Sequence, residues 1–588
     1  MEMHRIPWEE MRKALSFELE YVRDNKGRGY RLSNGKKKGR EGKGWIYEFN
    51  LDEESVTQWL ENAKGTLRVG YLEFEATVIN LEPSSSALTL FLKDDLGEEV
   101  EQAIFEVDLS YLYEKMIERI ELIEAKPYHF RLDTAELLLN PRKEIVGEAG
   151  DIKLAEKLNS FQSSAIESSL RNKICFIWGP PGTGKTRTLG ILALNLVERG
   201  ERILIASHAN RAADNALIAV VEAMKDRGYD ELRIQRLITR YRFAMLDDAK
   251  PYALEEQKTR RLSEGQAAEC PTFPADMLAA IHALAAIHYL IRERLQILPD
   301  VARHLERIGD ELEGIFRRIY GSSEDERNDI QGEQGIEVNL SEKKIIVTTL
   351  TTIAVDSWFA EERFNTLIVD EGSMAPLPLL FIAASIADRV VIIGDPYQLP
   401  PIAVSDEDLE KRGLRDKAEL VRKWLRRDIF TLASKADSLE DLMKWQGENG
   451  DFVKFLSIQY RMPPVLCELV SRYFYNGKIK SKYEGKEGEC IVIVDTWKLS
   501  PTCEQDERYS RFNRKHAEKV IEIIEELLGE GFEEEQIGVI TPYRAQSSLI
   551  RRGLKDIGVD VEVGTIHTFQ GRQKEVILFD LTDADPLG

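Results

Sequence analysis

The sequence predicts an α/β protein in which parallel sheets are combined with a small β-barrel. From residue 174 onward, short apolar strands alternate with helices, as a parallel sheet requires. Between about residues 28 and 110, short alternating runs are broken by turns, which favours a barrel or a sandwich. The 588 residues also exceed what one hydrophobic core can organise, so roughly three to five domains are expected.

The elements follow one another along the chain. We expect an amphipathic N-terminal helix over residues 1–27, where Trp8, Met11 and Leu19 occur among charged residues. A β-barrel accessory domain with a stalk helix follows over residues 28–127. The strands expected in the first parallel sheet are 174–178, 202–206, 344–348, 366–369 and 390–393.

Composition and charge limit the possible functions. The net charge of −22 argues against a nucleic-acid partner for the chain as a whole, although a binding channel needs only a local basic lining. The basic loop at 26–43 could cover phosphates or simply be solvated, and the sequence leaves both open. Five cysteines without a Cys-x-x-Cys pair favour a reducing cytoplasm over a disulfide or zinc framework. The N-terminus has no apolar run, so no signal peptide is expected.

A phosphate-binding loop follows the strand 174–178 and precedes a leucine-rich helix. Its glycines allow backbone N–H groups to surround a polyphosphate at the start of a helix. Lys185 can then reach the β- and γ-phosphates, and the Thr186 hydroxyl can ligate Mg²⁺. The loop consists of Gly179, Pro180, Pro181, Gly182, Thr183, Gly184, Lys185 and Thr186.

An acidic pair, Asp370 and Glu371, ends the strand 366–369. The carboxyl end of a parallel strand is where α/β sheets bind ligands. Asp370 can hold Mg²⁺ opposite Thr186, directly or through water. Glu371 is then placed to orient and deprotonate the attacking water. The sequence therefore predicts nucleotide hydrolysis.

Two further segments complete the predicted catalytic set. Gln398 lies in Gly-Asp-Pro-Tyr-Gln-Leu-Pro-Pro after the strand 390–393, where it can hydrogen-bond a γ-phosphate. Arg461 lies in Gln-Tyr-Arg-Met-Pro, and an arginine supplied from a second domain can neutralise charge on the transferred phosphoryl group. We therefore expect Lys185, Glu371, Gln398 and Arg461 to be catalytic.

Together with these motifs, four other segments resemble the Upf-like branch of superfamily 1 helicases, class B. The resemblance covers about residues 152–581, and the additional segments are 158–162, 206–210, 541–546 and 564–572. It implies two tandem RecA-like domains. The implied parts are a first RecA-like domain at 152–215 and 336–402, a helical insertion at 216–335, and a second RecA-like domain at 403–588 with an incomplete C-terminal end.

The resemblance also implies an activity. It implies a motor that couples ATP hydrolysis, with Mg²⁺, to 5′→3′ movement on single-stranded nucleic acid. ATP would clamp the two domains together, with Arg461 on one and the phosphate loop on the other. No motif separates DNA from RNA, and we expect DNA. We also expect a cytoplasmic monomer.

By the same resemblance, Gln162 would read the adenine and Tyr460 would stack on it. Gly571 and Gln573 would lie at the nucleotide, where Gln573 replaces a glutamate that the family uses to accept a hydrogen bond from the ribose. The residues expected to contact the nucleic-acid backbone are Ser207, Asn210, Thr349, Thr541, Tyr543 and Thr565.

The sequence departs from the family after Asp580. The family continues to a last motif with a second catalytic arginine, whereas this sequence stops at Gly588 without one. We expect truncation or a further C-terminal segment. For a protein that ended at this residue, we expect ATP binding with strongly impaired hydrolysis.

Two other functions share part of the pattern. A nucleic-acid-dependent ATPase that remodels protein–nucleic-acid complexes with little unwinding would carry the same motifs. An AAA-type ATPase acting on proteins would share the phosphate loop. Gln398 in its setting and the Gln-Tyr-Arg-Met segment favour a two-domain motor over such a ring.

Overall fold

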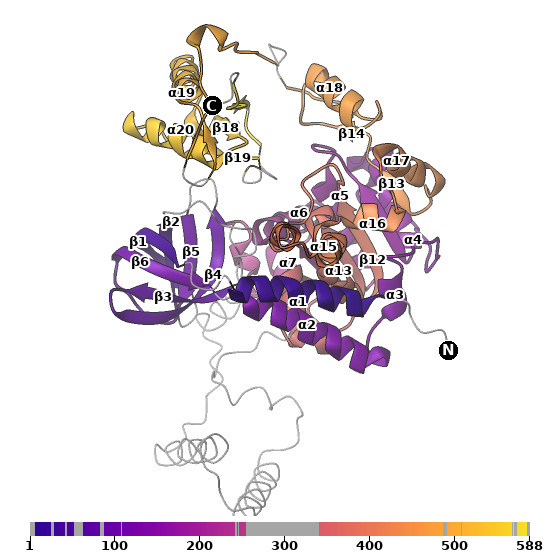
Figure 1. Ribbon diagram of the computed structural model, residues 1–588. Helices are drawn as coiled ribbons and strands as arrows, with labels where there is room; N and C mark the ends of the chain where they lie inside the picture. The colour runs from indigo at the N-terminus through magenta and orange to yellow at the C-terminus, as the bar shows by residue number, and fades with distance from the viewer. Residues whose placement is uncertain are drawn as a thin grey trace, which may run out of the picture. The chain divides into compact units, whose positions relative to one another are not determined.

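The computed structural model describes most of the chain, and its elements are labelled in Figure 1. Among the described residues, no helix is long and apolar enough to cross a membrane. Residues 255–335 of the expected insertion lie outside the described residues, as does Gly571. The described residues are 6–24, 29–41, 44–51, 63–82, 87–107, 109–241, 244, 246–254, 340–485, 491–506, 509–566, 569 and 573–584.

The N-terminal region consists of a helix, a closed barrel and a second helix. Tyr47, Phe49 and Phe105 fill the barrel interior, and β1 pairs with β6 to close it. The predicted barrel is therefore confirmed. The elements are α1 (Trp8–Asp24), β1 (Tyr30–Glu41), β2 (Gly44–Leu51), β3 (Lys64–Val69), β4 (Leu72–Glu82), β5 (Ala87–Leu92), β6 (Glu99–Val107) and α2 (Ser110–Ala125).

A seven-stranded parallel sheet follows, in the order β13-β7-β12-β11-β8-β10-β9. All five strands that the sequence predicts are present in it. The residues of these strands are almost entirely buried, as expected for a parallel sheet that is covered on both faces. They are β7 (Ile174–Trp178), β8 (Ile203–Ser207), β9 (Ile238–Arg240), β10 (Ile345–Thr349), β11 (Phe364–Asp370), β12 (Ala387–Gly394) and β13 (Val453–Phe455).

Helices lie before, between and after these strands along the chain. Because the strands are parallel, all of their carboxyl ends meet at one edge of the sheet, and the predicted catalytic motifs follow those ends. The helices are α3 (Leu132–Glu136), α4 (Ser160–Arg171), α5 (Lys185–Glu198), α6 (Asn210–Asp226), α7 (Glu231–Leu237), α11 (Leu350–Val355), α12 (Trp358–Glu361), α13 (Leu377–Ala384), α14 (Asp406–Lys411), α15 (Arg415–Val421), α16 (Ile429–Ser434), α17 (Leu439–Glu448) and α18 (Pro464–Phe474).

Two strands of this sheet lie beyond the boundaries predicted for the first RecA-like domain. Strand β9 falls within the expected insertion, 216–335, yet it pairs with β10. Strand β13 falls within the expected second domain, 403–588, yet it pairs with β7. Both are only three residues long. Such short strands give too weak a periodic signal to assign to a sheet from sequence.

A separate three-stranded parallel sheet, ordered β19-β18-β20, lies in the C-terminal region. Helices α19 and α20 turn apolar side chains such as Val520, Ile524 and Ile550 into its core. Its elements are α19 (Arg514–Gly529), β18 (Ile537–Thr541), α20 (Arg544–Asp556), β19 (Glu562–Thr565) and β20 (Val576–Phe579). Two-residue strands lie before it: β14 (Ile458–Gln459), β15 (Lys480–Ser481), β16 (Glu504–Gln505) and β17 (Arg511–Phe512).

A buried ion pair joins α6 to β9. Nε of Arg240 lies 2.7 Å from Oδ1 of Asp214, and both side chains are inaccessible to solvent. Asp214→Ala would leave the Arg240 charge buried without its partner, so we expect a loss of about 3–5 kcal/mol in the free energy of unfolding, measured by urea denaturation. Glu9→Ala, which removes the exposed pair with Lys13, should leave the unfolding midpoint unchanged. A shift of similar size in both variants would contradict this account.

Candidate nucleotide site

The phosphate loop lies between β7 and α5, at the carboxyl edge of the seven-stranded sheet. Gly182 and Gly184 have φ angles of 76° and 79°, a region that residues with a Cβ rarely adopt. Oγ1 of Thr183 donates to the Pro180 carbonyl at 2.7 Å, which closes the loop. Nζ of Lys185 donates to the Gly179 carbonyl at 3.0 Å. The loop is therefore shaped to bind a polyphosphate at the N-terminus of α5.

Three of the predicted catalytic side chains converge beside this loop. Nζ of Lys185 lies 3.7 Å from Oε1 of Glu371. With its amide oriented to satisfy both neighbours, Gln398 donates to Oε2 of Glu371 and accepts from Nζ of Lys185, each at 3.2 Å. The three residues come from segments that lie far apart in sequence. They form a connected cation–amide–carboxylate cluster where the terminal phosphate of a nucleotide would lie.

The acidic pair stands at the end of β11. Asp370 is buried, and its Oδ1 accepts the backbone N–H of Glu371 at 3.1 Å. Glu371 has a φ of 51°, a conformation that a residue other than glycine keeps only where its surroundings enforce it. Burial, and then the Glu371 charge, raise the pKa of Asp370 well above its ordinary value. A divalent cation beside Asp370 would favour the ionised carboxylate.

The residues present fit a magnesium ion that accompanies a nucleotide. Thr186 lies in the first turn of α5 and contributes a hydroxyl, and Asp370 contributes a carboxylate. Oxygen atoms of these two kinds are the ligands that Mg²⁺ prefers, usually together with water and phosphate oxygens.

The two residues expected at the adenine are brought close together. Nδ2 of Asn159 donates to the Tyr460 hydroxyl at 3.0 Å, and Asn159 forms a capping box with Gln162 at the start of α4. Nε2 of Gln162 also donates to the Thr183 carbonyl at 3.1 Å. Tyr460 is 43% exposed, so its ring is accessible to a ligand. Asn159 was not predicted as a site residue, although Asn-x-x-Gln is a capping-box sequence.

Arg461 lies against the phosphate loop, at Gly182. The Tyr460 N–H donates to the Gly182 carbonyl at 2.9 Å, and a Cβ built on Gly182 would lie 2.6 Å from Cβ of Arg461. Between β13, a strand of the first sheet, and Arg461 the chain passes through β14, which pairs with β15 in a separate sheet. Arg461 thus lies beside the phosphate loop, and its supply from a second domain stays a prediction.

Of the residues predicted to touch nucleic acid, four have buried side chains: Ser207, Asn210, Thr349 and Thr541. Asn210 accepts a hydrogen bond from Arg240 and donates one to the Ile79 carbonyl of β4, at 2.8 Å and 3.1 Å. Oγ1 of Thr349 lies 2.9 Å from Oγ1 of Thr352, at the start of α11. These side chains organise the loops at the edge of the sheet. A direct contact with a strand stays a prediction for all six residues.

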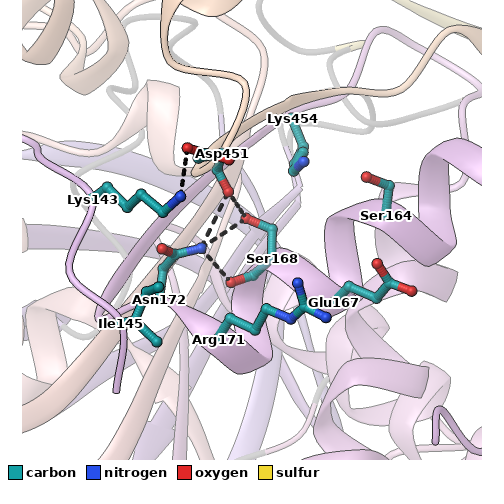
Figure 2. Close-up of a pocket in the computed structure, with 9 residues that line it drawn as sticks. All are labelled: Lys143, Ile145, Ser164, Glu167, Ser168, Arg171, Asn172, Asp451 and Lys454. Atoms are coloured by element: carbon teal, nitrogen blue, oxygen red, sulfur yellow. Dashed lines mark hydrogen bonds and ion pairs between the residues drawn. The ribbon is translucent and has the colours of Figure 1, made fainter. Parts of the chain in front are cut away.

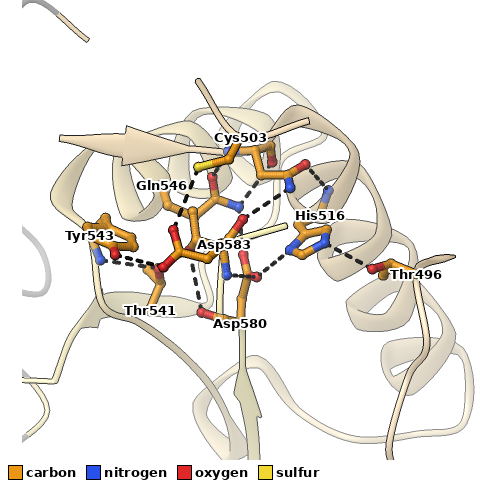
Figure 3. A network of polar contacts seen from close by, with 10 residues as sticks. Thr496, Cys503, His516, Thr541, Tyr543, Gln546, Asp580 and Asp583 are labelled. Atoms are coloured by element: carbon orange, nitrogen blue, oxygen red, sulfur yellow. Dashed lines mark hydrogen bonds and ion pairs between the residues drawn. The ribbon is translucent and has the colours of Figure 1, made fainter. Parts of the chain in front are cut away.

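Thr541 and Tyr543 belong to a polar network at the end of the C-terminal sheet (Figure 3). Thr541 lies 2.9 Å from the Thr582 hydroxyl, and Tyr543 donates to Asp583 at 2.9 Å. In the same network, Nδ1 of His516 lies 3.0 Å from Oδ1 of Asp580. Thr565 ends β19 in a half-buried position, and Gln573 is exposed. The expected place of Gln573 at the nucleotide stays a prediction.

A small pocket lies at the opposite edge of the seven-stranded sheet, where α4 ends and β13 begins (Figure 2). Its volume is about 120 Å³. Nδ2 of Asn172 and Oγ of Ser168 both donate to the Asp451 carbonyl, at 3.1 Å and 2.6 Å. The pocket contains none of the predicted site residues. Its lining residues are Lys143, Ile145, Ser164, Glu167, Ser168, Arg171, Asn172, Asp451 and Lys454.

One buried carboxylate near the site was not predicted. Asp395 lies three residues before Gln398, and it accepts hydrogen bonds from the Trp178 indole at 3.1 Å and the Tyr475 hydroxyl at 2.7 Å. Burial raises its pKa, against the effect of Lys185 and the hydroxyl. Asp395 thus ties the segment carrying Gln398 to the strand before the phosphate loop and to the end of α18. The aspartate is visible in the sequence, but its distant partners are not.

Comparison with known proteins agrees with this geometry. Two family models, each described as an AAA domain, match residues 157–406 and 437–585. The DNA polymerase alpha-associated DNA helicase A of Schizosaccharomyces pombe is 29% identical over 462 residues, covering 74% of this chain and 60% of that protein. An uncharacterized ATP-dependent helicase of Methanocaldococcus jannaschii is 25% identical over 489 residues, covering 74% of this chain and 66% of that protein.

A regulator of nonsense transcripts 1 homolog of Arabidopsis thaliana is 25% identical over 442 residues, covering 72% of this chain and 30% of that protein. The chain thus spans less than two thirds of the length of these relatives. The matched regions contain the phosphate loop, the acidic pair, Gln398 and the Gln-Tyr-Arg-Met segment. From these motifs and relatives, the chain belongs to the Upf-like superfamily 1 helicases.

Proposed function

We propose that the protein is an ATP-dependent helicase that moves 5′→3′ on single-stranded nucleic acid, using two RecA-like domains. The observation that carries the proposal is the cluster of Lys185, Gln398 and Glu371 at the mouth of the phosphate loop. A cation, a neutral amide and a carboxylate meet there, and these are the groups that phosphoryl transfer to water requires.

The positions of these side chains support the following proposed catalytic roles. Backbone N–H groups of the loop bind the β-phosphate region, and Lys185 turns from the Gly179 carbonyl toward the β- and γ-phosphates. Glu371 accepts a proton from the attacking water, and Gln398 holds Glu371 in position through its amide. Mg²⁺ bound with the nucleotide, held by Thr186 and Asp370, would neutralise part of the phosphate charge.

Arg461 and the adenine contacts complete the site. Arg461 stabilises charge on the γ-phosphate from the side of the first sheet, because its backbone is fixed beside Gly182. Within the protein, the Gln162 amide donates one hydrogen bond to Thr183 and accepts one from Asn159. Its second N–H and the second lone pair of its oxygen are left to hydrogen-bond the adenine base. Tyr460 is placed to stack on the adenine.

We propose single-stranded DNA as the substrate. The name of the Schizosaccharomyces pombe relative, a DNA helicase, supports this choice. Backbone contacts by residues such as Tyr543 and Thr565 would hold a strand without reading its sequence. We further propose that the protein acts as a cytoplasmic monomer.

The direction of movement is tested with two tailed duplexes that are identical except for the polarity of the single-stranded tail. We expect ATP-dependent strand separation from the 5′-tailed duplex at a rate at least about tenfold above that from the 3′-tailed duplex. ATP hydrolysis stimulated by single strands, with no separation of either duplex, would instead favour an ATPase that remodels protein–nucleic-acid complexes. Preference for the 3′ tail would contradict the proposed direction.

A further inference from the structure

A glutamate lies on the buried face of the N-terminal helix. The buried residues of α1 are spaced as one helical stripe, and Glu18 takes a place in it beside Leu15 and Leu19. Its side chain has no solvent exposure. Burying a carboxylate costs free energy unless hydrogen bonds compensate it. The burial of Glu18 therefore indicates that specific hydrogen-bond donors stabilise its carboxylate.

That partner is the end of the segment that carries Gln398. One oxygen, Oε1 of Glu18, accepts three hydrogen bonds: the Val404 N–H at 3.0 Å, the Ser405 N–H at 3.1 Å and the Ser405 hydroxyl at 2.9 Å. The other oxygen has no hydrogen-bond partner among the described residues. Burial raises the pKa of Glu18, while the bonds from Ser405 and Val404 oppose that rise.

The stretch between Gly394 and Ser405, here named the sensor segment, is held at both ends by buried carboxylates. Asp395 holds its first residues against Trp178 and Tyr475, as described above. Glu18 holds its last two. Between them, Pro400 and Pro401 restrict the backbone that follows Gln398. A shift at Ser405 is therefore transmitted to Gln398 over a short, stiff stretch of chain.

We propose that Glu18 is a positioning residue for ATP hydrolysis, which keeps Gln398 between Lys185 and Glu371 by holding Val404 and Ser405. The inference rests on the proposed function. It assigns the N-terminal helix a second role, because the helix that leads to the barrel also sets the geometry of the γ-phosphate sensor.

The test compares Glu18→Ala and Glu18→Gln with Glu10→Ala. Glu10 is the matched control because it also joins α1 to the same region, through Lys423 at 2.6 Å and the Trp424 indole at 2.9 Å, but does not touch the sensor segment.

For Glu18→Ala we expect kcat for ATP to fall about tenfold while KM changes less than about twofold, since catalytic groups are misplaced without loss of binding. Glu18→Gln keeps an oxygen acceptor and should recover most of kcat. Glu10→Ala should keep kcat within about twofold, whatever its thermal stability.

Equilibrium binding supplies a readout that does not need turnover. The quantity measured is the affinity for a non-hydrolysable ATP analogue divided by the affinity for ADP. We expect this ratio to fall about fivefold in Glu18→Ala, because Gln398 meets the γ-phosphate, which ADP lacks. Should Glu18→Ala fail to fold, Ser405→Ala removes one of the three bonds and should shift the same ratio in the same direction. An unchanged ratio and an unchanged kcat in folded variants would overturn the proposal. If the unmutated protein hydrolysed no ATP, the proposed function would be contradicted. The role of Glu18 would still be tested, because the ratio of binding affinities is measured without turnover.

Discussion

Glu371→Gln is expected to bind ATP with nearly unchanged affinity and to hydrolyse it at least about 100-fold more slowly. The substitution preserves size and can still contact Gln398, but an amide cannot accept a proton from the attacking water. Its position in the Lys185–Gln398–Glu371 cluster places this carboxylate within reach of the terminal phosphate. Steady-state turnover and equilibrium binding of a fluorescent ATP analogue measure the two effects separately.

Glu201→Gln is the matched control for that variant. Glu201 is buried to a similar degree, with 18% of its side chain exposed against 22% for Glu371, and it pairs with Arg389 away from the phosphate loop. We expect its turnover to stay within about twofold of the unmutated protein. Normal turnover by Glu371→Gln would show that another group activates the water.

Lys185→Ala is expected to lose ATP affinity by at least about tenfold and turnover by at least about 100-fold. The lysine supplies a positive charge at the phosphate loop, and its removal also deprives Glu371 of its ion-pair partner. The triphosphate then meets an uncompensated carboxylate. Isothermal titration calorimetry with ATP, together with the turnover assay, measures both losses.

Lys173→Ala provides the comparison for loss of a partly buried, paired lysine. The Lys173 side chain is 12% exposed and pairs with Glu144 at 3.4 Å and with Asp133, outside the nucleotide site. We expect ATP affinity to be unchanged in this variant, even if its thermal stability falls. ATP binding by Lys185→Ala as tight as by Lys173→Ala would mean that the phosphate loop does not hold the nucleotide in the manner described.

The sequence was sufficient to predict which side chains gather at the phosphate loop, because these residues lie in short, contiguous motifs. The phosphate loop, the pair Asp370–Glu371 and Gln398 each follow a strongly apolar strand, and parallel strands bring their carboxyl ends to one edge. Local pattern and global topology therefore agree, and the predicted side chains meet. The barrel was predictable for a similar reason, since strands such as β3, β4 and β5 alternate, but β1 falls within the segment 26–43 that the sequence indicates as a basic loop.

What the sequence did not predict depends on contacts between distant segments. The pairing of β13 with β7 is one such contact, because β13 has only three residues and nothing local indicates its partner. The burial of Asn210 and Thr349 follows from partners in β4, β9 and α11. Glu18 could have been noticed as a charged residue on an apolar helical stripe. Its partners, almost 400 residues away in sequence, could not.

In the proposed motor, the link between hydrolysis and movement would run through segments that respond to the γ-phosphate. The sensor segment is suited to this, because Asp395 joins it to Tyr475 at the end of α18, on the path toward the C-terminal sheet.

The most direct test of the central claim is steady-state ATP turnover, measured at low salt with the protein alone, with single-stranded DNA and with single-stranded RNA. The account predicts that one polymer raises the rate at least about tenfold over the basal rate, and that DNA is the better activator. Equal turnover in all three conditions, with ATP and single strands both still bound, would contradict the assignment of a nucleic-acid motor.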